Sequence, residues 1–165
     1  MLRTTFILLA VLCAIVAVVV LVGYALPVAH VASRDATLSA PPERVFAALT
    51  EVERYPSWRS DVKSVELLPW AAAPRWREHG SNGAITFERT ELQPPNRIVT
   101  RIADTDLAFG GTWTYELTPE GGGTRLTITE RGEVYNPVFR FMSRFVFGHT
   151  ATMEKFLADL RSYLR

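Results

Sequence analysis

The residues best suited to chemistry in this sequence are four ionisable side chains, Glu78, Arg89, Glu130 and His149. The first three lie in segments where apolar and polar residues alternate, which is typical of a strand with one face toward a core. Large apolar residues stand two positions away from each of them, so we expect the three charges to point inward. An isolated buried charge is strongly unfavourable, and each of them therefore needs a partner.

Two interpretations of the inward charges follow. They form a polar cluster that orients the head group of a ligand, or they have a structural role, either as an ion pair at the mouth of a pocket or as charges that strand twist exposes to solvent. We favour the structural role, because networks that only stabilise a fold also gather charges. If the ligand interpretation holds, removal of Arg89 weakens ligand binding more than folding.

His149 is a candidate general acid or base, since an imidazole titrates near neutral pH. A lone histidine without an orienting partner is more often structural, and we favour that role. His30 lies close to an apolar N-terminal run, and His79 is expected to face outward. We therefore expect no metal site, no cofactor and no assigned catalytic residue.

Composition excludes several classes of function. The chain has 18 Lys and Arg against 17 Asp and Glu, with a net charge of +1, so it has no basic footprint for nucleic acid. Its single cysteine, Cys13, lies in the apolar run and rules out a disulfide within the domain. The motifs of phosphate-binding loops, dinucleotide-binding folds, serine hydrolases and zinc proteases are absent from the sequence.

Residues 6–26 form an uncharged apolar run long enough to cross a membrane as a helix. A cleaved signal peptide with its site after Ala25 is the alternative, but signal peptides usually have shorter apolar regions. We therefore expect residues 1–27 to be a membrane anchor, 28–33 a linker and 34–165 the folded domain. Arg3 weakly favours an N-terminus inside, with the domain outside a bacterial cytoplasmic membrane.

The remaining chain predicts two short helices, an antiparallel meander and a long final helix. Prolines at 41 and 42 open the first helix, and the second covers 50–55. Strands are expected at 34–39, 62–68, 75–79, 84–92, 97–103, 112–117 and 124–130, with turns such as 93–96 and 119–123 between them. Asn136 and Pro137 begin a helix that runs to about residue 164 as one apolar stripe, with Gly148 as a possible kink.

This order predicts an α+β fold in which a curved antiparallel sheet wraps around the long helix and encloses a cavity. Aromatic side chains either line that cavity or form ordinary core, while methionines supply adaptable apolar surface. Together with the charges, the predicted ligand-binding residues are Trp58, Trp76, Glu78, Phe87, Arg89, Trp113, Tyr115, Glu130, Met142, Phe145, His149, Met153 and Phe156. Phe139, Phe141 and Phe147 lie off the stripe, and we favour their packing under the loop at 104–111 over contact with a membrane.

Five stretches carry a family resemblance: APPERVFAALTEVERYPSWRSDVKSVELL, WREHG, FERTELQPPNRIVTRI, GGTWTYELTPEGGGTRLTITERGEV and NPVFRF. Over residues 34–165 the chain resembles the START-related, Bet v 1-like superfamily, particularly its bacterial polyketide cyclase/dehydrase and lipid-transport branch. The resemblance implies a helix-grip fold and a hydrophobic small molecule or lipid as ligand. We expect membrane-tethered binding or transfer without catalysis. The alternatives are a cyclase/dehydratase-like enzyme using His149 or Glu130, and an envelope scaffold that binds a protein partner.

Overall fold

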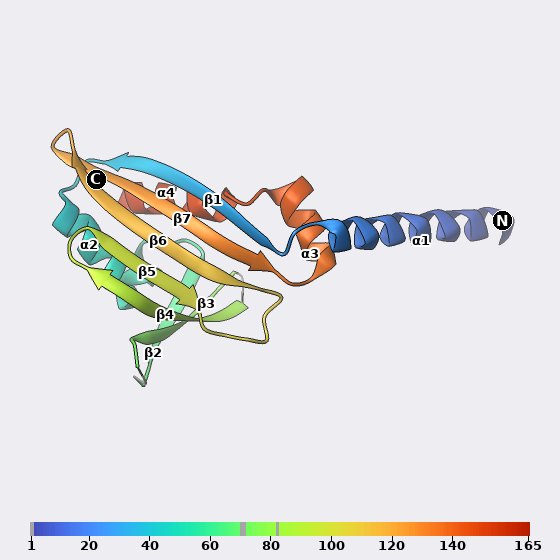
Figure 1. The fold of residues 1–165 in the computed structure, drawn as a ribbon, viewed down its shortest axis with the longest axis horizontal. Helices are drawn as coiled ribbons and strands as arrows, with labels where there is room; N and C mark the ends of the chain where they lie inside the picture. The colour runs from blue at the N-terminus through green and yellow to red at the C-terminus, as the bar shows by residue number, and fades with distance from the viewer. Residues whose placement is uncertain (1, 70–71, 82) are drawn as a thin grey trace.

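The computed structural model describes residues 2–69, 72–81 and 83–165. A curved seven-stranded antiparallel sheet with the order β1-β7-β6-β5-β4-β3-β2 forms the body, and helix α1 (Leu2–Ala25) projects from one end of it (Figure 1). The strands are β1 (Ala29–Leu38), β2 (Val62–Leu68), β3 (Arg75–Gly80), β4 (Gly83–Gln93), β5 (Arg97–Ile102), β6 (Phe109–Glu120) and β7 (Gly123–Val134).

Helix α4 (Ala151–Tyr163) fills the concave face of the sheet. The short helices α2 (Pro42–Thr50) and η1 (Val52–Ser57) close the end of the sheet away from α1 (Figure 1). Large core side chains that are less than 2% exposed come from the sheet, from α2 and from α4, and they include Leu38, Val45, Ile98, Leu126, Ile128, Met153 and Leu160. The predicted α+β helix-grip fold is confirmed.

The first strand is longer than predicted. β1 begins at Ala29 and pairs with β7 from the partners Ala29 and Glu133 onward, so most of the expected linker at 28–33 is strand. Small and polar residues in this stretch hide the alternation that identifies a strand. As a result, only residues 26–28 separate α1 from the sheet.

The predicted continuous C-terminal helix is interrupted at Gly148, where φ is 74° and ψ is 162°. Asn136 caps the first part as predicted, since its side-chain oxygen accepts hydrogen bonds from the backbone N–H groups of Val138 and Phe139. This part consists of α3 (Pro137–Met142) and one π-helical turn, η2 (Ser143–Phe147). Phe147 is one of the three aromatic residues predicted to lie off the apolar stripe, and its side chain is outside the part of the chain that the structure describes.

Candidate ligand-binding site

A cavity of about 520 Å³ lies between the concave face of the sheet, η1, α3 and α4. Alternation along the strands turns the larger apolar side chains toward it. The predicted residues that line the cavity are Trp76, Glu78, Phe87, Trp113, Tyr115, Glu130, Met142, His149 and Phe156. Aromatic rings make up much of the wall, and Trp113, Tyr115 and Phe156 contact one another with centroids 5.8–6.1 Å apart.

Four predicted residues lie outside the cavity wall. Met153 and Trp58 are buried in the core, where Trp58 packs edge-on against Phe156. Phe145 is 59% exposed, because the π-helical turn shifts the angular positions of its residues away from the predicted stripe. The Arg89 guanidinium lies over the Trp76 ring, 5.6 Å from its centroid, and donates to the carbonyl oxygen of Thr50 at 2.9 Å.

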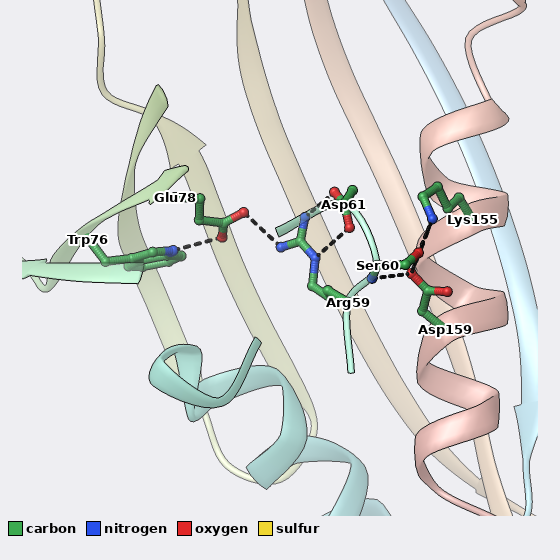
Figure 2. A network of polar contacts seen from close by, with 7 residues as sticks. All are labelled: Arg59, Ser60, Asp61, Trp76, Glu78, Lys155 and Asp159. Atoms are coloured by element: carbon green, nitrogen blue, oxygen red, sulfur yellow. Dashed lines mark hydrogen bonds and ion pairs between the residues drawn. The ribbon is translucent and has the colours of Figure 1, made fainter. Parts of the chain in front are cut away.

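The three predicted inward charges do not form one cluster. Glu78 pairs instead with Arg59, a residue in the loop after η1 that strand alternation gives no means of finding. Arg59 donates to Glu78 Oε2 at 2.9 Å and to Asp61 Oδ2 at 2.7 Å. The Trp76 indole N–H donates to the other Glu78 oxygen at 2.9 Å, so both carboxylate oxygens are satisfied (Figure 2).

Burial and charge oppose each other in this group. Burial disfavours the charge of Arg59, but the carboxylates of Glu78 and Asp61 outweigh it and raise the pKa of Arg59. Burial raises the pKa of Glu78, and the contacts with Arg59 and Trp76 only partly offset it. The neighbouring loop is fixed to α4, because Asp159 accepts hydrogen bonds from the Ser60 N–H and hydroxyl at 2.9 and 2.8 Å (Figure 2). The group is therefore a fixed polar feature of the cavity wall.

A second polar group lies on the β1–β7 side of the cavity. His30 Nε2 is 3.3 Å from Glu130 Oε1, and the His30 ring stacks on the His149 ring at 3.9 Å between centroids. Trp113 of β6 is the cross-strand neighbour of Glu130. A Cβ at Gly132 would overlap the His30 ring, so this glycine makes room for the histidine.

The partner of His149 was missed because His30 was placed in a linker, where small and polar residues hide the strand that pairs with β7. Burial lowers the pKa of both histidines, and the proximity of His30 lowers that of His149 further. Burial raises the pKa of Glu130, although Trp113 and His149 act in the opposite direction. Among the described residues, no group of three or more His, Cys, Asp or Glu side chains is placed to hold a metal ion.

Residues 29–165 match the model of the family described as polyketide cyclase/dehydrase and lipid transport. The matched range includes the whole sheet, both polar groups and every helix except α1. The chain belongs to this family. The sequence-based assignment is therefore confirmed, and the domain is of a type that binds hydrophobic small molecules. No curated protein sequence matches the chain significantly.

Solved structures share the same fold. The Zhui aromatase/cyclase from Streptomyces sp. R1128 is 17% identical with a TM-score of 0.66, covering 82% of this chain and 92% of its own. A START superfamily protein from Mycobacterium smegmatis is 18% identical with a TM-score of 0.64, covering 82% and 97%. A protein from Thermus thermophilus is 24% identical with a TM-score of 0.65 and the same coverage. At these identities the likeness establishes the fold alone.

Proposed function

We propose that this family member binds a lipid or a similar hydrophobic molecule in its cavity and holds it at a membrane. The observation that carries the proposal is the aromatic-walled cavity of about 520 Å³, within the range of small-molecule sites. The Arg59–Glu78 and His30–Glu130–His149 groups suit a ligand with one polar end. Its apolar part would lie against the aromatic rings.

The proposed tether is α1. Among the described residues, Leu2–Ala25 is the one helix that is long and apolar enough to cross a membrane. A signal sequence has the same properties. Retention is supported by the packing of Gly23 against Pro137 and by the Arg140 guanidinium, which lies 6.0 Å from the centroid of the Tyr24 ring. We propose that α1 stays attached, with its N-terminus inside and the domain outside the cytoplasmic membrane.

Filling the cavity tests the binding proposal. Thr100 lines the cavity, and Thr100→Phe adds a ring there, whereas Thr100→Val changes little volume. We expect detergent-solubilised full-length protein to bind one equivalent of cis-parinaric acid saturably. Thr100→Phe should reduce this binding at least tenfold, while Thr100→Val retains it. Failure of the wild-type protein to bind the fatty acid, or undiminished binding by Thr100→Phe at an unchanged melting temperature, would contradict the proposal.

An acid–base enzyme is the second candidate, because the structure gives His149 the nearby partners that its sequence context lacked. An imidazole pair beside a buried carboxyl is suited to moving a proton on a bound ligand. The two functions differ in the fate of a co-purified ligand. If the wild-type protein releases it chemically altered while His149→Ala binds it unaltered, the protein is an enzyme; identical ligands from both favour a carrier.

A further inference from the structure

The α3–η2 segment, residues 137–147, carries an unusual apolar surface for its length. Phe139, Phe145 and Val146 are 53%, 59% and 58% exposed. Soluble proteins seldom present several large apolar side chains on one short segment, and a contiguous patch of this kind usually marks a contact surface. Arg144, which is also exposed, adds a positive charge to the same segment.

This segment lies directly against α1 (Figure 1). Gly23 is the one residue of α1 that is buried, and a Cβ there would overlap the carbonyl oxygen of Pro137. Phe141 shares an apolar groove with α1 residues Val11, Ala14, Ile15, Val18 and Val19. Val19 lies six residues before the end of α1, so the groove begins about 9 Å inside the apolar span.

Several of the residues that line the cavity at the same end of the sheet are exposed. The antiparallel register places the start of β1, the end of β7, the start of β6 and the β3–β4 turn at the end of the sheet nearest α1 (Figure 1). The cavity is lined there by Gly83, Phe109 and Val134. Phe139 of the α3–η2 segment and Gly148 directly after it also line the cavity, and both are exposed, which places this segment at the rim of the cavity.

We propose that the α3–η2 segment is inserted into the membrane leaflet at the C-terminal end of α1, so that the cavity opens directly onto lipid. The inference rests on the proposed tether, which fixes the depth of the segment. Insertion removes Phe139, Phe145 and Val146 from water, as in an interfacial amphipathic helix. Arg144 can extend toward the lipid phosphates. Ligand then passes between the leaflet and the cavity without crossing water.

Fluorescence quenching in phosphatidylcholine vesicles tests the insertion with the full chain. Phe145→Cys is made in a Cys13→Ser background and labelled with the environment-sensitive dye NBD. We expect doxyl-labelled phosphatidylcholine to quench this label and aqueous iodide to leave it largely unquenched. Thr118→Cys, an exposed site toward the opposite end of β6, is the matched control and should show the reverse pattern.

The native Cys13 separates failure of the inference from failure of the tether. Labelled in the otherwise unchanged chain, it should be quenched by doxyl lipid if α1 spans the bilayer. Quenching at Cys13 without quenching at position 145 would overturn the insertion and leave the tether in place. Absence of lipid quenching at Cys13 would overturn both.

Discussion

The imidazole rings of His30 and His149 stack in the wall of the cavity with their centroids 3.9 Å apart and their planes inclined by 26°. The two residues come from strand β1 and from the break between η2 and α4, 119 positions apart in the sequence (149 − 30). Glu130 of β7 and Arg144 of η2 are the charged groups that influence the pair. Stacked imidazoles are most stable when they are not both protonated, which makes the pair sensitive to pH.

We expect acidification from pH 7.5 to pH 5.5 to destabilise the protein through these histidines. Their pKa values are lowered in the fold, so the unfolded chain takes up protons first as the pH falls. The contribution of the two histidines to stability is fully present above about pH 6.5, which is the pKa of a histidine in the unfolded chain. It is lost as the pH falls below that value. The raised pKa of Glu130 acts in the opposite sense, because at this carboxyl the folded protein takes up a proton before the unfolded chain does.

His149→Phe removes one partner and should flatten this pH dependence. The measurement is the melting temperature in detergent at each pH. His79→Gln is the matched control, because His79 has a side chain 44% exposed and only a long 3.9 Å contact with Glu66. Equal slopes for the wild-type protein and His149→Phe would show that the pair does not control the response.

Arg59→Met should lower the free energy of unfolding by about 3–5 kcal/mol, because it leaves Glu78 buried without its cation. The side chains of Arg59 and Glu78 are 12% and 8% exposed. Adding Glu78→Gln to Arg59→Met removes the unpaired charge and should recover about 1–2 kcal/mol. Urea unfolding followed by tryptophan fluorescence measures each value.

Arg54→Met provides the comparison for Arg59→Met. Arg54 pairs with Glu51 at 2.9 Å, but their side chains are 66% and 49% exposed, so its loss should change stability by at most about 0.5 kcal/mol. Similar losses for Arg54→Met and Arg59→Met would mean that the Arg59 network contributes no more than a surface ion pair.

The sequence predicted all seven strands of the sheet, apart from the first residues of β1, because alternation and turn residues are local signals. It placed Trp76, Phe87 and Trp113 on the inward face, and all three line the cavity. The Arg59–Glu78 pair depends instead on how a loop folds back over the sheet. No periodicity in sequence encodes the position of such a loop residue.

The two errors at the ends of the domain have different physical origins. His30 was missed because the polar, small residues of early β1 carry no alternation, although backbone pairing with β7 holds them as strand. Phe145 was misplaced because helical spacing assumes an unbroken helix. A π-helical turn followed by Gly148 breaks that assumption.

Gly148→Ala distinguishes the interrupted helix from a continuous one, because the two predict opposite changes in the free energy of unfolding. In a continuous helix the alanine would stabilise the protein by about 1 kcal/mol. At φ 74° a side chain is strained, and a Cβ there meets no atom within 4 Å that would compensate. We therefore expect a loss of about 1–3 kcal/mol in the free energy of unfolding. A gain in stability would contradict the break.

Gly23→Leu should separate α1 from α3, since any side chain at Gly23 overlaps the backbone of Pro137. Hydrogen exchange of residues 137–147 in vesicles should then accelerate about tenfold or more, equivalent to about 1.4 kcal/mol. Ala10→Leu adds a similar bulk at an exposed position of α1 and should leave the exchange unchanged. Unaltered exchange in Gly23→Leu would show that the two helices are not packed together in the bilayer.

Phe145→Asp should slow the entry of lipid into the cavity while leaving the cavity intact. Phe145 does not line the cavity and is 59% exposed, so we expect its effect on lipid entry to act through the contact of the α3–η2 segment with the membrane. Loss of one buried aromatic side chain corresponds to roughly tenfold or more in an equilibrium. With photoactivatable phosphatidylcholine in the same vesicles, the rate of crosslinking to Trp76 and Phe87 should fall by about that factor.

Phe145→Leu should crosslink at the wild-type rate, and both variants should bind cis-parinaric acid normally in detergent. Equal crosslinking by Phe145→Asp and Phe145→Leu would mean that lipid reaches the cavity by a route independent of this segment.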